Sequence, residues 1–326
     1  MIKNLVLSAC GPNLVTMIGV LHELYEQNYW NLDNIECFYG SSGGTIITVF
    51  LLLSDDFNML KDYIIKRPWD KVWPIDANAV FSMYENLGIF SIDDFYKGFE
   101  PFFKAKNIDK NITLKEFYEL TKKPIYIYIA ELNNFEGFHV NYKTHPEMKL
   151  LEAIYKSSSV PGIFIPILED NKCYIDGGLL NYFPTGEALK KSDKSTILGL
   201  CNNRSGKCNT ITSKSNIIDF LTTLLFKNMD FVIDSIFKTD NLENIIYVPG
   251  FNDNNLWLEI INSKNKREEM YNLGIQTAQK FLSNHSSKTE EEKTEEKETE
   301  EIKTEEKETK KKETEEKKTE EKEIET

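Results

Sequence analysis

The chain has 326 residues, of which 40% are hydrophobic, and its formal net charge is −13 at pH 7. This length allows one large domain or two smaller ones, with a sizeable core. The acidic balance argues against a nucleic-acid partner, because nucleic-acid binding depends on Lys and Arg side chains that neutralise phosphates. The five cysteines are odd in number, widely spread and without a Cys-x-x-Cys pair. This pattern favours reduced thiols in the cytoplasm and argues against a zinc site.

The N-terminal part of the chain alternates strands with helices. We expect a strand at residues 3–8, a helix at 14–27, a strand at 35–39 and a helix at 43–54. The apolar part of the first strand has only about five residues, fewer than the ~7–15 of a signal-peptide core. The apolar run at 45–53 is likewise shorter than the ~20 residues that span a bilayer. We therefore expect a cytoplasmic protein, soluble or peripherally bound to a membrane, without a signal peptide or transmembrane segment.

The later parts of the chain continue this alternation. Thr113 is placed to cap a short helix before a strand at 125–130, which is rich in β-branched and aromatic residues. A further strand is expected at 197–200, and amphipathic helices at 216–237 and 266–282, where apolar residues recur every three or four positions. This alternation predicts a three-layer α/β fold, in which helices cover both faces of a mostly parallel sheet.

The segment 64–103 does not repeat a strand-helix unit and is expected to form a cap. It is rich in aromatic residues: Trp69, Trp73, Phe81, Tyr84, Phe90, Phe95, Tyr96, Phe99, Phe102 and Phe103. Core packing of a helical insertion accounts for most of them. Any exposed ones would instead form an apolar wall for an acyl chain or contact a membrane surface.

The C-terminal segment differs in composition from the rest. Residues 288–326 contain eighteen Glu and eleven Lys, a net charge of −7, with Thr as the other main residue. Such a segment has almost no apolar surface and is expected to be disordered or a transient single helix; a docking or phosphorylated segment is the alternative. We therefore divide the chain into a folded domain at 1–285 and a charged tail at 286–326.

The most informative motif is Gly40-Ser-Ser-Gly-Gly44, which has the form Gly-x-Ser-x-Gly. It lies between an apolar strand and an apolar helix, which is the context of a nucleophile elbow. In such an elbow Ser42 takes a strained backbone angle that exposes its hydroxyl, and Ser41, Gly43 and the flanking glycines form the tight turn. The start of the helix directs free N–H groups toward the serine. The alternative is a Gly/Ser turn without a catalytic role.

A second motif, Asp176-Gly177-Gly178, follows the short apolar segment 172–175. It places a carboxylate at the end of a strand, in a loop with open backbone. Asp-Gly is also a typical turn dipeptide, so a plain β-turn is the alternative.

The four histidines do not suit a Ser-His-Asp triad. A triad in the chain order Ser, Asp, His needs a histidine after the acid, and only His285 follows Asp176, at the edge of the charged tail. His22 lies on the apolar first helix, and His139 and His145 flank a loop. A Ser-Asp dyad therefore fits better, in which the aspartate itself acts as general base toward the serine.

These motifs, and the order in which they follow one another along the chain, resemble those of the patatin-like phospholipases. The matching parts are 113–120 with 125–132, the elbow at 40–44, the Ala-x-x-Ser-x-Ser-x-Pro-like segment 153–166, Asp176-Gly-Gly178, Asn181 and Pro184. The resemblance covers roughly residues 3–200. It implies a lipid acyl hydrolase acting on a lipid or phospholipid, with Ser42 as nucleophile, Asp176 as base, and neither metal nor cofactor.

One stretch departs from the family pattern. The family's oxyanion loop is Gly-Gly-Gly-x-Arg-Gly, and the corresponding residues here are Ala9-Cys10-Gly11-Pro12-Asn13-Leu14. Cys10 and Gly11 keep backbone N–H donors, and Asn13 would donate from its side-chain amide in place of arginine. In the family pattern, glycines allow the unusual backbone angle that directs such donors at the oxyanion. The loss of one well-placed donor raises the activation free energy by on the order of 3 kcal/mol. This loop therefore leaves open a catalytically impaired lipid-binding or scaffold protein with the same fold. A lipid acyltransferase is a second alternative, which a dry, deep pocket would favour.

Overall fold

The computed structural model describes residues 1–54, 56–75, 83–203, 210–213, 215, 220, 223–224, 227, 242–250 and 256–285. The predicted tail at 286–326 and nearly all of the predicted helix at 216–237 lie outside these residues, as do Phe81 and Cys208. The chain divides into two units, Met1–Ala278 and Gln279–Thr326. Of the second unit the structure describes residues 279–285, which are helical.

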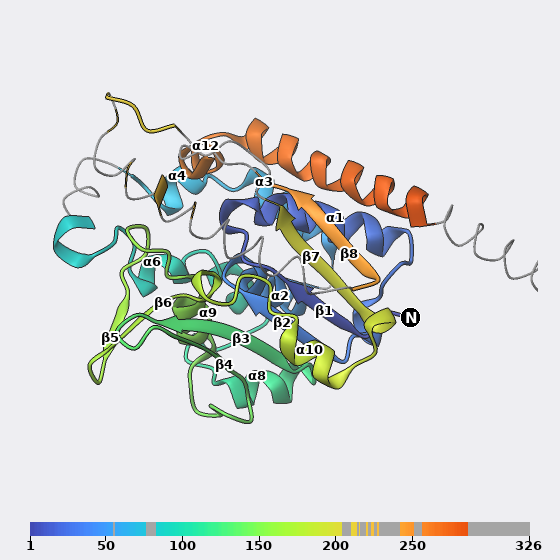
Figure 1. The fold of residues 1–326 in the computed structure, drawn as a ribbon, viewed down its shortest axis with the longest axis horizontal. Helices are drawn as coiled ribbons and strands as arrows, with labels where there is room; N and C mark the ends of the chain where they lie inside the picture. The colour runs from blue at the N-terminus through green and yellow to red at the C-terminus, as the bar shows by residue number, and fades with distance from the viewer. Residues whose placement is uncertain are drawn as a thin grey trace, which may run out of the picture. The chain divides into compact units, whose positions relative to one another are not determined.

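A mostly parallel sheet forms the centre of the first unit (Figure 1). Its strands in the described part of the chain are β1 (Asn4–Leu7), β2 (Cys37–Ser41), β3 (Ile125–Glu131), β4 (Glu136–Val140), β5 (Ile167–Glu169), β6 (Lys172–Asp176), β7 (Ile197–Asn203) and β8 (Asn244–Pro249). The spatial order is β5-β6-β3-β2-β1-β7-β8, with β4 paired to β3. The pairs among β3, β2, β1, β7 and β8 are parallel, whereas β4 and β6 run antiparallel to β3. The carboxyl ends of the five parallel strands therefore lie at one edge.

Helices cover both faces of this sheet. Those described in the first unit are α1 (Leu14–Glu26), α2 (Gly43–Leu53), α3 (Phe57–Lys66), α4 (Trp69–Val72), α6 (Ile92–Tyr96), α7 (Glu100–Ala105), α8 (Leu114–Thr121), α9 (Leu150–Ser158), α10 (Gly186–Lys191), α12 (Leu256–Asn262) and the helical residues 264–278. Helices α2 and α9 pack on one face, over β2 and β3, and α1 lies beside α2. On the other face Ala188 of α10 joins a buried cluster with Cys37 and Tyr39 of β2. The three-layer α/β fold predicted from the sequence is confirmed.

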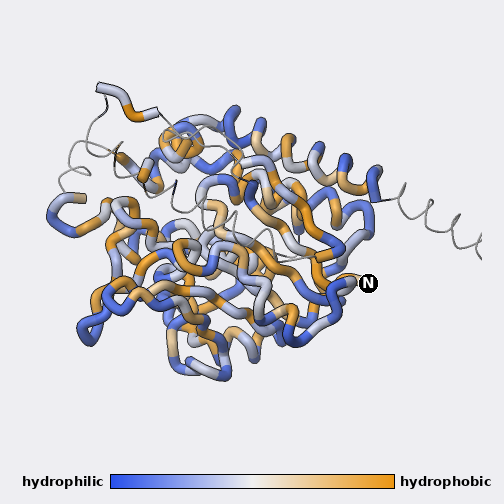
Figure 2. Tube along the Cα trace, viewed as in Figure 1, coloured by the Kyte–Doolittle hydropathy of each residue, from blue (hydrophilic) through white to orange (hydrophobic). Residues whose placement is uncertain are grey.

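The alternation of side chains along β2 explains why both faces are covered. Cys37 and Tyr39 point to the α10 side, whereas Phe38, between them, points to the opposite face and is fully buried. A strand that is apolar on both faces needs a layer on each side. Figure 2 shows the same pattern, with hydrophobic colour along the strands and hydrophilic colour at the tip of the β5–β6 hairpin.

Most predicted elements agree with the structure to within a few residues. The main shift is in β2, predicted at 35–39, which begins at Cys37 and extends to Ser41 because it pairs with β3 up to the Ser41–Tyr128 position. Thr113 caps α8 as expected, in a capping box with Glu116. In the described part of the chain, we find no helix with the length and apolar character needed to cross a bilayer.

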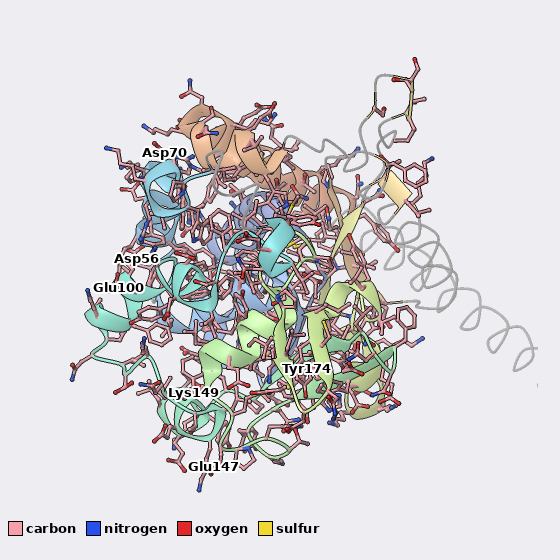
Figure 3. The ribbon with its side chains drawn as sticks, turned by 90° about the vertical axis from the view of Figure 1, so that its left-hand side faces the viewer. Asp56, Asp70, Glu100, Glu147, Lys149 and Tyr174 are labelled. Carbon is pink, nitrogen blue, oxygen red and sulfur yellow. The ribbon has the colours of Figure 1, made fainter. Side chains whose placement is uncertain are left out.

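The described part of the segment 64–103 contains several short helices joined by turns and bends, and core packing accounts for most of its aromatic residues. The buried ones are Trp69, Phe90, Phe95, Phe99, Phe102 and Phe103. Phe50 of α2 stacks on Phe99 at 4.8 Å, which ties the segment to the layer above the sheet. Tyr84 is the exception, with 89% of its surface exposed. Acidic residues such as Asp70 of α4 and Glu100 of α7 lie on the outer side of this segment (Figure 3).

Candidate active site

Ser42 lies at the sharp turn between β2 and α2. Its backbone has φ 51° and ψ −124°, in the left-handed range that is uncommon for a residue with a side chain. The turn is tight because α2 starts close to β1: a Cβ on Gly44 would lie 2.3 Å from the Leu7 carbonyl oxygen. Side chains are excluded at the two neighbouring glycines as well. A Cβ on Gly40 would lie 2.9 Å from Thr45 N, and a Cβ on Gly43 would lie 2.5 Å from Cys10 Sγ. Ser41 completes β2 and is fully buried.

Asp176 reaches the same place from the other side of β3. It ends β6 opposite Ile129, while Ser41 of β2 lies opposite the preceding residue of β3, Tyr128. The chain after Asp176 then passes close over β3, because a Cβ on Gly177 would lie 2.1 Å from the Tyr128 carbonyl oxygen. Gly178 is equally confined, since its Cβ would lie 2.4 Å from the Ala9 Cβ. The two glycines thus allow the approach of the aspartate loop to the elbow.

The Ser42 hydroxyl donates a hydrogen bond from Oγ to Asp176 Oδ2. The other carboxylate oxygen, Oδ1, accepts the Gly178 N–H at 2.7 Å. Ser42 is 3% exposed and Asp176 is 5% exposed, so the pair is largely shielded from water. Burial raises the pKa of Asp176 to about 7, although the hydrogen bonds from Ser42 and Gly178 act in the opposite direction. At neutral pH this carboxylate is therefore able both to take up and to release a proton.

No histidine is part of this pair. His22 contacts the Tyr271 hydroxyl, His139 packs against Tyr126, His145 contacts Thr144 and His285 stacks on Phe281. Among the described residues no histidine ring bonds to Ser42 or Asp176. In the same residues no three His, Cys, Asp or Glu side chains gather in a metal-binding arrangement.

The loop that follows β1 lies against the start of α2. Gly11 has φ 49°, which glycine adopts without strain, whereas Cys10 has φ −145°, a value open to any residue. The N–H groups of Cys10 and Gly11 donate to no acceptor within the described ranges. A Cβ on Gly43 would lie 3.2 Å from Gly11 N, which places this N–H beside the first residue of α2. Burial, and then the nearby Asp176, raise the pKa of the Cys10 thiol, so this residue keeps its proton.

Asn13 does not take the role that the sequence suggested. Its side-chain amide donates to Asn202 Oδ1 at 2.8 Å and to the Pro249 carbonyl oxygen at 3.0 Å. Both amide hydrogens are therefore used at the ends of β7 and β8. The prediction that Asn13 donates to the oxyanion is wrong, and the loop offers the backbone donors of Cys10 and Gly11 instead.

Ser157 at the end of α9 is a site residue that the sequence did not single out. Its Oγ accepts the Ser42 N–H at 3.0 Å and donates to the Tyr128 carbonyl oxygen at 2.6 Å. Thr45 Oγ1 lies 3.3 Å from the same atom. Ser157 therefore joins the elbow, β3 and α9 at the residue with the strained backbone. Its place in the segment 153–166 is the only signal that the sequence offered.

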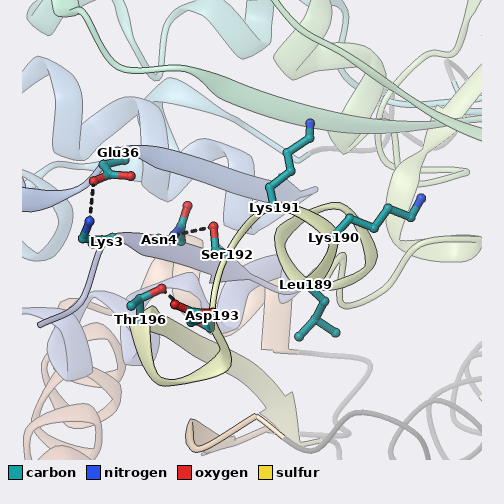
Figure 4. A pocket seen from close by; sticks show the side chains of 9 residues that line it. All are labelled: Lys3, Asn4, Glu36, Leu189, Lys190, Lys191, Ser192, Asp193 and Thr196. Atoms are coloured by element: carbon teal, nitrogen blue, oxygen red, sulfur yellow. Dashed lines mark hydrogen bonds and ion pairs between the residues drawn. The ribbon is translucent and has the colours of Figure 1, made fainter.

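Among the hollows in the described part of the first unit, two differ in character. An almost wholly apolar slot begins beside Pro12 and Ile46 and runs between α2 and α12. The other, of about 450 Å³, is lined by Lys3, Asn4, Glu36, Leu189, Lys190, Lys191, Ser192, Asp193 and Thr196 (Figure 4). It lies where β1 begins and just before β7 begins, at the end of the strands opposite to Ser42. The polar hollow is therefore remote from the Ser42–Asp176 pair.

The fold and the site together define an α/β protein with a serine at a sharp strand-to-helix turn and an aspartate that accepts a hydrogen bond from it. A family model described as Patatin-like phospholipase matches residues 5–189, more than half of the chain. The chain belongs to the patatin-like phospholipase family.

Individual relatives are consistent with this assignment. The chain is 29% identical over 278 residues to "Probable lipid hydrolase 463L" of Invertebrate iridescent virus 6, which covers 85% of this chain and 87% of that protein. It is 26% identical over 226 residues to "Uncharacterized protein R571" of Acanthamoeba polyphaga mimivirus, and this match covers 68% of this chain and 74% of that protein. Among solved structures, VipD from Legionella pneumophila matches with a TM-score of 0.52 at 16% identity, over 87% of this chain and 67% of VipD. At that identity the likeness concerns the fold alone.

Proposed function

We propose that this protein is a serine lipid acyl hydrolase of the phospholipase A type, which uses Ser42 and Asp176 as a catalytic dyad. The hydrogen bond between Ser42 Oγ and Asp176 Oδ2 carries this proposal. The lipid hydrolase name of the viral relative supports the substrate class. Family membership supports the reaction class.

The proposed reaction has two halves. Asp176 takes the proton from Ser42 Oγ while that oxygen attacks the ester carbonyl, and the tetrahedral intermediate then releases its alcohol, which receives the proton. The acyl group remains on Ser42 Oγ. In the second half Asp176 takes a proton from water, the hydroxide oxygen attacks the acyl-enzyme, and the proton returns to Ser42 as the fatty acid leaves.

Backbone N–H groups would hold the oxyanion that forms in each half. Cys10 and Gly11 offer such donors beside the start of α2, where the helix dipole also favours negative charge. In this loop the residue with a positive φ is Gly11, which as a glycine adopts that angle without strain. Ala9 and Cys10, which replace two glycines of the family pattern, do not have a positive φ, so their side chains cause no backbone strain. This observation weakens the main reason for regarding the chain as a catalytically impaired scaffold.

The test compares the full chain with Ser42→Ala and Asp176→Asn on short-chain nitrophenyl esters and on phospholipid vesicles. Each variant is expected to lose at least about 10³-fold in kcat, because the two groups act as a unit. Exposed residues of the same types provide matched controls, Ser195→Ala and Asp193→Asn, which should keep wild-type turnover. Circular dichroism checks that every variant is folded.

A fluorophosphonate provides a second readout, because it labels an activated serine directly. Labelling of wild type and none of Ser42→Ala supports the dyad. If wild type neither cleaves any ester nor reacts with the fluorophosphonate, the proposal is wrong and a scaffold role takes its place. Acyl transfer to an added lipid alcohol in preference to water would instead identify an acyltransferase.

A further inference from the structure

The apolar slot beside α2 has the position and the chemistry of a binding site for a hydrocarbon chain. Ile46 of α2 lies on its wall one helical turn after Ser42, whose carbonyl oxygen accepts the Ile46 N–H at 3.2 Å. Phe50, one turn further, lies on the same wall, so the slot follows α2 away from the nucleophile. Pro12, next to Gly11 in the loop after β1, borders the same space.

The opposite wall comes from a part of the chain beyond the residues that match the family model. Trp257 and Ile261 of α12 line the slot. The indole Cζ2 of Trp257 is 3.9 Å from the position of a Cβ on Gly11. This wall therefore lies against the loop that carries the proposed oxyanion donors.

Arg267 fixes this wall in place. It is 4% exposed, and Nη1 donates to the Ile261 carbonyl oxygen of α12 at 3.2 Å. Nε and Nη2 donate to the Ile65 carbonyl oxygen of α3 at 3.0 and 2.9 Å. These carbonyl groups lie near the carboxyl ends of α3 and α12, where the helix dipoles favour the positive charge of the guanidinium. The guanidinium thus joins α12 to α3, and the nearby Asp70 carboxylate acts on it electrostatically.

The space inside the slot is small. Its volume is about 70 Å³. An apolar cavity of about 150 Å³ is large enough for benzene, so this slot accepts only a few carbons without rearrangement. Gly98 lines it without a side chain, and a Cβ there would lie 3.2 Å from Trp73 Cζ2.

We propose that the slot receives the acyl chain of the ester cleaved at Ser42, and that Trp257 and Gly98 set the length of chain it accepts. This inference rests on the proposed function and assigns a specificity role to the segment 256–267. A short acyl chain fits the slot as it stands, and a longer one requires Trp257 to move.

The kinetic test measures kcat/KM on nitrophenyl esters with acyl chains of two to sixteen carbons. Wild type is expected to prefer short chains, with a loss of roughly tenfold or more once the slot is filled. Trp257→Ala should shift the optimum to longer chains. Gly98→Ala, which adds one methyl group inside the slot, should shift it to shorter ones. Leu120→Ala, at a 57% exposed position on α8, is the control and should leave the profile unchanged.

A binding readout does not depend on turnover. Three of the four tryptophans, Trp69, Trp73 and Trp257, line the slot, whereas Trp30 lies elsewhere and donates to the Leu21 carbonyl oxygen. Bromine quenches indole fluorescence at short range. In Ser42→Ala, 4-bromobutanoate, which is short enough for the slot as it stands, should therefore quench most of the tryptophan emission, and added unbrominated butanoate should restore it. Trp30 supplies the unquenched remainder.

The outcomes separate this inference from the proposed function. If wild type cleaves esters but both slot variants keep its chain-length profile, the acyl site lies elsewhere and this inference is wrong. The inference is also wrong if 4-bromobutanoate leaves the emission unchanged. If 4-bromobutanoate quenches but no ester is cleaved, the proposed hydrolase activity is wrong and the slot remains a hydrocarbon site. Should Trp257→Ala fail to fold, Trp257→Phe and Gly98→Ala provide the same comparison.

Discussion

At the scale of single residues, the environment of the Asp176 carboxyl predicts how activity depends on pH. A general base must be ionised, and burial raises the pKa of this group to about 7. We therefore expect kcat/KM on a neutral ester to rise as pH increases through about 7 and to level off above it. The measurement is a pH–rate profile from pH 5 to 9 with a nitrophenyl ester. A profile that is flat from pH 5 to 9 would show that no group with a pKa near 7 acts as the base.

The same group predicts the opposite trend for stability. Below about pH 4 both the folded and the unfolded chain carry this proton, and the contribution of Asp176 to stability is highest. Between about pH 4 and 7 the unfolded chain releases a proton that the folded chain keeps, so the free energy of unfolding falls with rising pH. Above about pH 7 the loss is complete, at about 4 kcal/mol.

Asp176→Asn should therefore be more stable than wild type at pH 8 while inactive. The advantage should shrink toward pH 4, where the wild-type group is protonated as well. Urea unfolding of both chains at pH 4.5, 6 and 8 measures this difference. Equal differences at all three values would contradict the raised pKa.

Ser157 is expected to hold Ser42, the proposed nucleophile, in position. Ser157→Ala leaves the Ser42 N–H and the Tyr128 carbonyl oxygen without the hydroxyl that joins them. A nucleophile displaced by about 1 Å costs roughly 10²-fold, so kcat should fall by about this factor while KM changes little. The fluorophosphonate labelling rate of Ser42 should fall in parallel. Ser158→Ala is the matched control, because the Ser158 hydroxyl has no partner among the described residues.

At the scale of elements, α1 and the helical residues 264–278 cross at two glycines. A Cβ on Gly19 would lie 2.2 Å from the Tyr271 carbonyl oxygen, and one on Gly274 would lie 2.1 Å from that of Thr16. Helix propensity alone favours Gly→Ala by about 1 kcal/mol. Here the clash outweighs propensity, because the two backbones have to separate.

Gly19→Ala and Gly274→Ala are each expected to lower the free energy of unfolding by about 1–3 kcal/mol. Gly186→Ala in α10 is the control with the opposite expectation, since a Cβ there meets nothing within 4 Å. Thermal unfolding of the three variants tests the sign. A rise in Tm for Gly19→Ala like that for Gly186→Ala would show that the helices are not in close contact.

The elements that depend on local sequence were predictable, and the contacts between distant elements were not. The elbow at Ser42 follows from an apolar strand, a Gly-rich turn and an apolar helix in one stretch. The error at Asn13 arose because its partners, Asn202 and Pro249, are 189 and 236 residues away in the chain. Ser157 was missed for the same reason, since its role depends on how α9 lies over β3.

At the scale of the whole molecule, net charge is the property that would govern contact with a lipid surface. The chain carries −13, of which −7 belongs to residues 288–326. An anionic membrane therefore repels the chain as a whole. Salt screens this repulsion, because the Debye length falls from ~30 Å at 0.01 M salt to ~3 Å at 1 M.

We expect the protein to hydrolyse phosphatidylcholine vesicles several-fold faster than vesicles enriched in phosphatidylglycerol at low salt, with the difference disappearing at high salt. A chain that ends at His285 keeps only −6 of the charge, so its discrimination against anionic vesicles should be about halved on the logarithmic scale. Its turnover of a soluble short-chain ester should match that of the full chain, because the removed segment has almost no apolar residues to contribute to a core. Fatty-acid release measured across a salt series for both chains tests the argument. Equal rates on the two vesicle types at low salt would show that net charge does not control access to the lipid, and loss of soluble-ester turnover in the shortened chain would show that the tail belongs to the folded domain.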